Sequence, residues 1–202
     1  MERSRRRNRE SDTNYWIGYT DLLSNSLLVL LLIITVAALA RANNEKPPLL
    51  RLTEKDSFRF GTGSYTLNPQ FKSELDSRLP WIRDQIKKYR IDSVEVIGHT
   101  DGQPSPGNSN LDLLVPKSGS SAPLNGYQSG SNTDLGLLRA LAVSKYLKIK
   151  LAASGIQNIT VRPYSAGSLI GVDGAFAPAD MKERADRRRI ELRFTRQDES
   201  SS

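Results

Sequence analysis

The sequence predicts a single N-terminal transmembrane helix followed by one α/β domain, a mixed sheet of about four strands with two to three helices on one face. The first observation is residues 22–40, an apolar run without a formal charge. As one helix, a run of this length crosses a bilayer core of roughly 30 Å. The second is that strand and helix patterns alternate along the rest of the chain. With no cysteine and one histidine, the chain has no disulfide framework and no multi-histidine metal site.

Residues 1–14 form a basic tail ahead of the apolar run. Five arginines lie in this tail: Arg3, Arg5, Arg6, Arg7 and Arg9. The flank after the run is only weakly basic, so the positive-inside rule places the N-terminus in the cytoplasm and the domain across the membrane. Ala38-Leu39-Ala40 leaves a cleaved signal peptide as an alternative, although the segment is longer than usual signals. Nucleic-acid binding is not expected, because such arginine runs flank many membrane anchors.

The predicted transmembrane helix, residues 15–40, carries one carboxylate, Asp21, near a membrane boundary. A carboxylate there costs about 2.5–3.5 kcal/mol on insertion scales. At helical spacing Ser24, Asn25 and Thr35 fall within roughly 60° of it and form a polar stripe. Such a stripe is expected where a helix packs against other transmembrane helices. The alternative is an interfacial residue near the helix N-terminus, where the helix dipole favours an anion.

Residues 41–56 are predicted to be a polar linker, because Asn43-Asn44 and Pro47-Pro48 interrupt any helix. The domain is expected over residues 57–197. Its predicted elements, in order, are a strand over 57–60, a helix from Asn68 to about Tyr89, a strand over 93–98, a helix over 134–153, and strands over 159–164 and 189–196. Asn68 is a suitable helix cap and Pro69 a suitable first residue.

Three ordered motifs carry a resemblance to a known family. They are Gly98-His99-Thr100-Asp101-Gly102 after a strand, Asn132-x-x-Leu135-Gly136-x-x-Arg139-Ala140-x-x-Val143 on a helix, and Arg187-Arg188-Arg189-Ile190-Glu191-Leu192 at the last strand. Together they resemble the OmpA-like peptidoglycan-binding domain. With Tyr19-Thr20-Asp21 in the membrane helix, the chain resembles MotB-type B subunits of ion-driven stator motors. Its short linker is similar to that of ZorB-type subunits of the Zorya anti-phage systems.

The chain departs from the family pattern at three places. Gly136 stands where the family has serine, and Arg187 where it has asparagine. The third departure is the 37 residues between Asp101 and Arg139, more than the family usually has. The excess lies in residues 103–131, rich in Pro, Gly, Ser and Asn, and is predicted to be an inserted surface loop.

The resemblance implies recognition of diaminopimelate in peptidoglycan stem peptides, whose free end presents an ammonium and a carboxylate on one carbon. It assigns Asp101 to the ammonium and Arg139 to the carboxylate as a bidentate cation, with hydrogen bonds from Thr100 and Asn132. In the alternative, Asp101 and Arg139 pair with each other as a structural ion pair. His99 is expected to be a hydrogen-bonded turn residue, and no metal or other cofactor is implied.

For the membrane part, the resemblance implies that Asp21 carries an ion in a motor of the bacterial inner membrane, with the domain in the periplasm. A proton is the favoured ion, and sodium is the alternative. The implied partners are a second B subunit and a pentameric ring of polytopic A subunits of the MotA or ZorA type. Enzymatic activity is not expected. Anti-phage defence is the favoured role, and the alternatives are a flagellar-type stator and a passive peptidoglycan tether that conducts no ions. A tether gains nothing from an intramembrane carboxylate, so Asp21 favours the motor.

Overall fold

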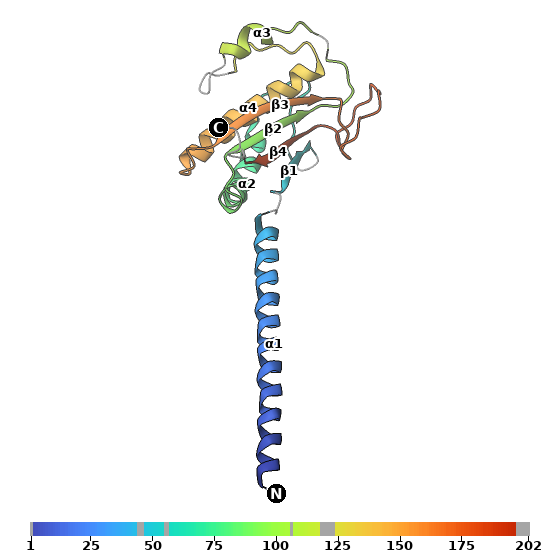
Figure 1. The fold of residues 1–202 in the computed structure, drawn as a ribbon. Coiled ribbons are helices and arrows are strands. Elements are labelled where there is room, and N and C mark those ends of the chain that lie inside the picture. Colours follow the sequence, from blue (N-terminus) through green and yellow to red (C-terminus); the bar gives the residue numbers. More distant parts are fainter. Residues whose placement is uncertain (1, 44–46, 55–56, 106, 118–123, 197–202) are drawn as a thin grey trace. The chain divides into compact units, whose positions relative to one another are not determined.

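The computed structural model describes residues 2–43, 47–54, 57–105, 107–117 and 124–196. The chain divides into two units, residues 1–46 and 47–202, which are described separately. The first unit is one helix, α1 (Glu2–Asn43) (Figure 1). Its segment Tyr15–Arg41 is long and apolar enough to cross a membrane. The helix extends through the basic tail because residues 2–14 contain no glycine or proline to interrupt it.

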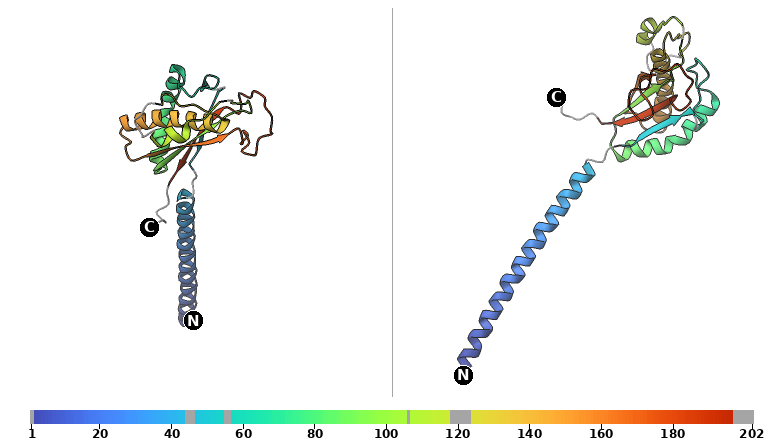
Figure 2. Two further views of the ribbon diagram at one scale, coloured as in Figure 1. Left: turned by 90° about the horizontal axis from the view of Figure 1, so that it is seen from above. Right: turned by 90° about the vertical axis from the view of Figure 1, so that its right-hand side faces the viewer.

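The second unit contains a mixed four-stranded sheet of the predicted kind. Its strands are β1 (Leu49–Thr53), β2 (Ser93–His99), β3 (Thr160–Gly167) and β4 (Arg189–Thr195). Their order in the sheet is β1-β4-β2-β3 (Figures 1 and 2). The central strand β4 runs antiparallel to both of its neighbours, whereas β2 and β3 are parallel.

The first strand lies elsewhere than predicted, inside the segment expected to be linker. β1 pairs with β4 and buries Leu52, which is opposite Ile190. The expected strand over 57–60 is wrong, because Phe58 and Phe60 instead pack their rings on Phe71 of the following helix, 5.2 and 4.8 Å between centroids. The predicted linker 41–56 is therefore too long. The helix ends at Asn43 and the strand begins at Leu49, so only residues 44–48 connect them.

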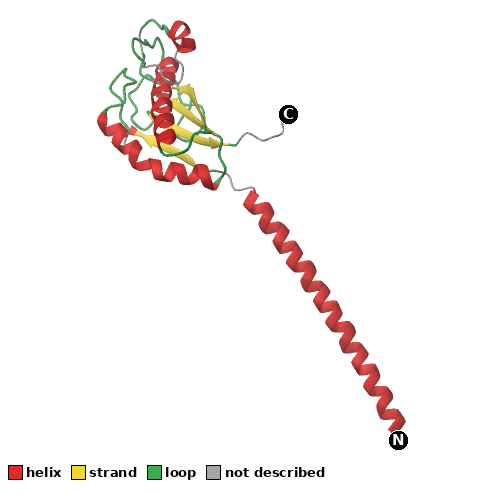
Figure 3. Ribbon diagram, turned by 90° about the vertical axis from the view of Figure 1, so that its left-hand side faces the viewer, coloured by secondary structure: helices red, strands yellow, loops and turns green. Residues whose placement is uncertain are grey.

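Two long helices, α2 (Pro69–Lys88) and α4 (Asn132–Ala153), pack on one face of the sheet (Figure 3). The predicted cap of α2 is confirmed, because the Phe71 N–H donates to Asn68 Oδ1 at 2.7 Å. Ser131 caps α4 and accepts from the Asp134 N–H at 3.1 Å. The core between helices and sheet includes Phe71, Leu75, Ile82, Val94, Val96, Leu138, Val143, Leu147, Ile190, Leu192 and Phe194.

The connection from β2 to α4 contains residues 103–131, predicted to be an inserted surface loop. It carries two short helices, α3 (Leu111–Leu114) and η2 (Val115–Lys117), and extends away from the sheet (Figure 1). Leu111 is buried, so part of this segment is packed. The insertion is therefore partly structured, with hydrophobic contacts of its own.

Candidate functional site

A pocket of about 500 Å³ opens where β2 ends and α4 begins. Thr100 and Asp101 follow β2 directly, while Asn132 and Arg139 lie in the first part of α4, and all four line the pocket. The structure therefore brings together the four residues that the resemblance assigned to ligand binding. Their closeness depends on contact between β2 and α4 without intervening side chains: a Cβ on Gly98 would lie 2.0 Å from the Gly136 carbonyl oxygen.

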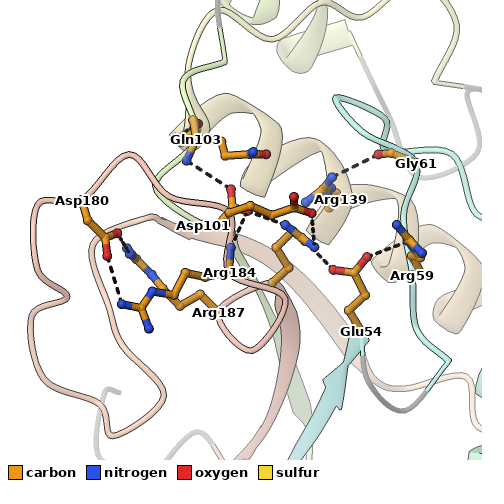
Figure 4. Close-up of polar contacts among 12 residues, drawn as sticks. Glu54, Arg59, Gly61, Asp101, Gln103, Arg139, Asp180, Arg184 and Arg187 are labelled. Carbon is orange, nitrogen blue, oxygen red and sulfur yellow. Dashed lines mark hydrogen bonds and ion pairs between the residues drawn. The ribbon is translucent and has the colours of Figure 1, made fainter.

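Asp101 is buried and its carboxylate is held by three groups (Figure 4). It forms an ion pair with Arg188. It also accepts hydrogen bonds from the Gln103 N–H at 3.3 Å and the Arg184 N–H at 3.2 Å. The alternative in which Asp101 and Arg139 pair with each other is wrong, because the cation paired with Asp101 is Arg188.

Arg188 is a pocket residue that the sequence reasoning did not identify. Its guanidinium bridges three carboxylates, those of Asp101, Glu54 and Glu183. Glu54 in turn pairs with Arg59 at 2.9 Å (Figure 4). The position of Arg188 in the third motif was the feature of the sequence that could have indicated it as a pocket residue. Glu54 could not be identified, because it belonged to the segment expected to be linker.

Arg139 is a buried cation, only 4% exposed. Its Nε donates to the Ser64 carbonyl oxygen at 2.9 Å and its Nη2 to that of Gly61 at 3.3 Å (Figure 4). Its guanidinium carbon lies 4.9 Å from the centroid of the Phe60 ring. Burial lowers the pKa of Arg139 to about 10, and nearby charges have smaller effects. Arg139 is therefore still protonated at neutral pH, and a ligand carboxylate would offset the cost of burying its charge.

Thr100 and Asn132 complete the predicted set. Thr100 is 1% exposed, and among the residues that the structure describes its Oγ1 has no hydrogen-bond partner. A buried hydroxyl left without a partner costs about 1–3 kcal/mol. Asn132 Nδ2 donates to the Gln103 carbonyl oxygen at 2.8 Å, which ties α4 to the start of the insertion. The Thr100 hydroxyl is therefore buried without a partner among the described residues at the edge of the pocket, while Asn132 already supports the pocket wall.

His99 is the last residue of β2, and this differs from the prediction of a hydrogen-bonded turn residue. Its ring is buried, and neither ring nitrogen has a hydrogen-bond partner in the described part of the chain. The Nε2 atom lies 3.6 Å from Glu191 Oε2, beyond normal hydrogen-bond length. His99 therefore lies beside the buried carboxylate of Glu191.

Asp21 lies inside α1, 19 residues after the first helical residue, Glu2. Asn25 Nδ2 donates to Asp21 Oδ1 at 3.4 Å, so these two members of the predicted polar stripe share one face. The Thr35 hydroxyl donates to the Leu31 carbonyl oxygen at 2.8 Å. The helix-dipole alternative for Asp21 is wrong in this structure, because that effect falls off within the first turn of a helix.

Comparison with protein-family models and with curated proteins gave no match. Comparison with solved structures gave 26 matching chains. A MotB-like protein from Desulfovibrio vulgaris is 20% identical, with 74% of this chain and 75% of that chain covered and a TM-score of 0.46. The periplasmic domain of Helicobacter pylori MotB is 19% identical, with 74% and 83% covered and a TM-score of 0.45.

The cell wall anchor of the T6SS from Pseudomonas aeruginosa is also similar. It is 21% identical, with 73% of this chain and 81% of that chain covered and a TM-score of 0.40.

Proposed function

We propose that this chain is the B subunit of a proton-driven motor in the bacterial inner membrane, anchored to peptidoglycan by its α/β domain. The observation that carries the proposal is the pocket. In it a buried guanidinium, Arg139, and a buried carboxylate, Asp101, are held by other groups, next to a hydroxyl of Thr100 that lacks a partner among the described residues. This arrangement suits a ligand with two opposite charges.

The charges that line the pocket match the end of diaminopimelate. Three carboxylates and three guanidinium groups line the pocket, those of Glu54, Asp101 and Glu183 and of Arg59, Arg139 and Arg188, so its charges balance. A ligand end with one ammonium and one carboxylate keeps this balance. The carboxylates are the partners for the ligand ammonium, and Arg139 is the partner for the ligand carboxylate. Guanidinium donors fixed by backbone carbonyls present a rigid fork, which favours bidentate binding.

The membrane part of the proposal rests on Asp21. It is a carboxylate within the apolar segment Tyr15–Arg41, with Asn25 beside it on one face. One helix cannot enclose an ion pathway, so we infer a second copy of this chain and a pentameric ring of polytopic A subunits around the pair. Asp21 would bind a proton from one side and release it to the other as the packing of the partner helices changes. The short connection, residues 44–48, favours the compact Zorya anti-phage type over the flagellar type.

Sedimentation of the full-length, detergent-solubilised protein with purified peptidoglycan that contains diaminopimelate tests the wall-binding part. We expect wild-type protein to sediment and Arg139→Ala to lose about ten- to a hundredfold in affinity, since the ligand carboxylate loses a charged partner worth about 1.5–3 kcal/mol. Arg78→Ala on the exposed side of α2 is the matched control and should bind as wild type does. Folded wild-type protein that stays in the supernatant would refute peptidoglycan anchoring.

A further inference from the structure

One wall of the pocket is built by the insertion, and its chemistry differs from that of the remaining walls. Gln103, Asn108, Tyr127, Gln128 and Ser129 line this side of the pocket, and none of them is charged. In the described part of the chain, the charged residues that line the pocket all lie outside residues 103–131. The insertion therefore adds a neutral surface of amides and hydroxyls to a pocket that also contains charged groups.

Hydrogen bonds between the two arms of the insertion form this wall before any ligand arrives. Asn110 joins the arms, because its Nδ2 donates to the Gly126 carbonyl oxygen and its Oδ1 accepts from the Gln128 N–H, both at 2.8 Å. The arms also approach closely at Gly130, where a Cβ would lie 2.8 Å from the Ser109 nitrogen. Gln128 thus uses its backbone for these contacts and keeps an exposed side chain.

The wall is also attached to the domain. The Tyr65 hydroxyl donates to the Leu124 carbonyl oxygen at 2.9 Å, across 59 residues of sequence. The Tyr127 hydroxyl donates to the Leu114 carbonyl oxygen at 3.0 Å, which fixes the second arm to the short helices. A surface held in this way binds a ligand without first paying the entropy of ordering its own backbone.

We infer that this wall is a second subsite, which takes the peptide groups of the stem peptide next to its diaminopimelate. The inference rests on the proposed function and names the part of the ligand that the insertion contacts. The side chains of Asn108 and Gln128 each offer donors and an acceptor, which peptide groups can satisfy in both directions. A pocket of about 500 Å³ also falls in the range that holds ligands larger than one amino-acid end.

Calorimetric titration of the full-length protein in detergent distinguishes the two subsites. The probes are free meso-diaminopimelate and the tripeptide L-alanyl-γ-D-glutamyl-diaminopimelate. We expect wild-type protein to bind the tripeptide about tenfold more tightly than the free amino acid. The double substitution Asn108→Ala with Gln128→Ala should remove this advantage and leave the Kd for free diaminopimelate unchanged. Asp112→Asn, on the insertion but outside the pocket, should behave as wild type.

Retained affinity for free diaminopimelate shows that the double variant is folded. Equal affinity of wild-type protein for both probes overturns the second subsite and leaves the proposed function in place. Equal loss for both probes in the double variant also overturns it, because the wall would then only support the charged site. Binding of neither probe by wild-type protein overturns the proposed function and the second subsite together.

Discussion

Arg188 determines the electrostatics of the pocket, because it takes up the charge of Asp101 and leaves Arg139 to backbone carbonyls. The first two motifs of the sequence placed Thr100, Asp101, Asn132 and Arg139 at one site, and the structure brings these four residues together. The sequence could not assign Arg188, since this residue precedes β4 and its partners are distant in sequence. Glu54 lies 134 residues from Arg188.

Asp21→Asn tests the proton-carrying role. The amide keeps the shape of the side chain and still contacts Asn25, but it cannot bind and release a proton. We therefore expect insertion and co-purification with the polytopic partner to be unchanged, while proton uptake by membrane vesicles and phage protection fall to background. Asp21→Glu, which retains a carboxyl group, is the control and should keep part of the activity. Full activity of the Asn variant would end the motor hypothesis.

Glu191 on β4 is the centre of a second group of charges that the sequence did not predict. It is 2% exposed, and arginines from two strands, β4 and β1, lie around its carboxylate. Arg189 Nε lies 2.9 Å, Arg193 Nη2 3.3 Å and Arg51 Nε 3.4 Å from its oxygens, with His99 at 3.6 Å. Burial raises the pKa of Glu191, but contacts with His99 and Arg189 outweigh it, so this pKa lies well below its usual 4.5.

Glu191→Gln should lower the free energy of unfolding by about 3 kcal/mol at pH 7, because Arg189 then keeps a buried charge without a counter-charge. The folded-state pKa of Glu191 is below the unfolded value of 4.5, so its contribution is complete above pH 4.5 and is lost as pH falls further. The difference in free energy of unfolding between variant and wild type should shrink in the same pH range. Urea denaturation of residues 47–202, monitored by the fluorescence of Trp81, measures this free energy.

Asp84→Asn on the exposed side of α2 is the control for this experiment and should stay within about 0.5 kcal/mol of wild type at each pH. A difference between Glu191→Gln and wild type that does not change below pH 4.5 would contradict the assignment.

The packing of α4 on β2 and β3 explains why Gly136 stands where the family pattern has serine. A Cβ on Gly136 would lie 2.5 Å from Ser165 Oγ and 2.9 Å from the Gly98 carbonyl oxygen. The Ser165 hydroxyl on β3 fills this space and donates to the Thr133 carbonyl oxygen at 2.7 Å. In this chain a strand residue thus supplies the hydroxyl at the contact. Arg187, which stands where the resembled pattern has asparagine, also has a structural partner, because it pairs with Asp180 at 2.9 Å.

Gly136→Ser should therefore destabilise the domain by about 1–3 kcal/mol through overpacking. Combination with Ser165→Ala removes the nearest clashing atom and should recover part of this loss. Urea denaturation of the two single variants and the double variant gives the coupling energy, which we expect to be at least about 0.5 kcal/mol. Strictly additive losses would show that Ser165 is not the reason for the glycine.

Elements with a strong local signal were predictable, and those decided by distant contacts were not. Asn68 and Pro69 marked the start of α2, and alternation over Ile190, Leu192 and Phe194 marked β4. β1 was missed because its five residues become a strand only by pairing with β4, some 140 residues later. The insertion was recognised from composition, but its role as a pocket wall depends on bridges such as that of Asn110 to Gln128.

The two units of the chain are joined by a shorter connection than the sequence predicted. Residues 44–48 remain between Asn43 and Leu49, and fully extended they span at most about 20 Å. The proposal of a Zorya-type subunit rests in part on this short connection.

Single-cysteine labelling tests the orientation on which wall binding depends. The chain has no native cysteine, so Thr13→Cys and Asn125→Cys each introduce one reactive thiol, the first in the basic tail and the second at an exposed position of the insertion. The excess of arginine before the apolar segment predicts a cytoplasmic N-terminus. In spheroplasts a membrane-impermeant maleimide should therefore label Asn125→Cys directly and Thr13→Cys only after the membrane is permeabilised. The opposite pattern would place the pocket in the cytoplasm, where it meets no peptidoglycan, and would refute both the topology and the anchoring proposal.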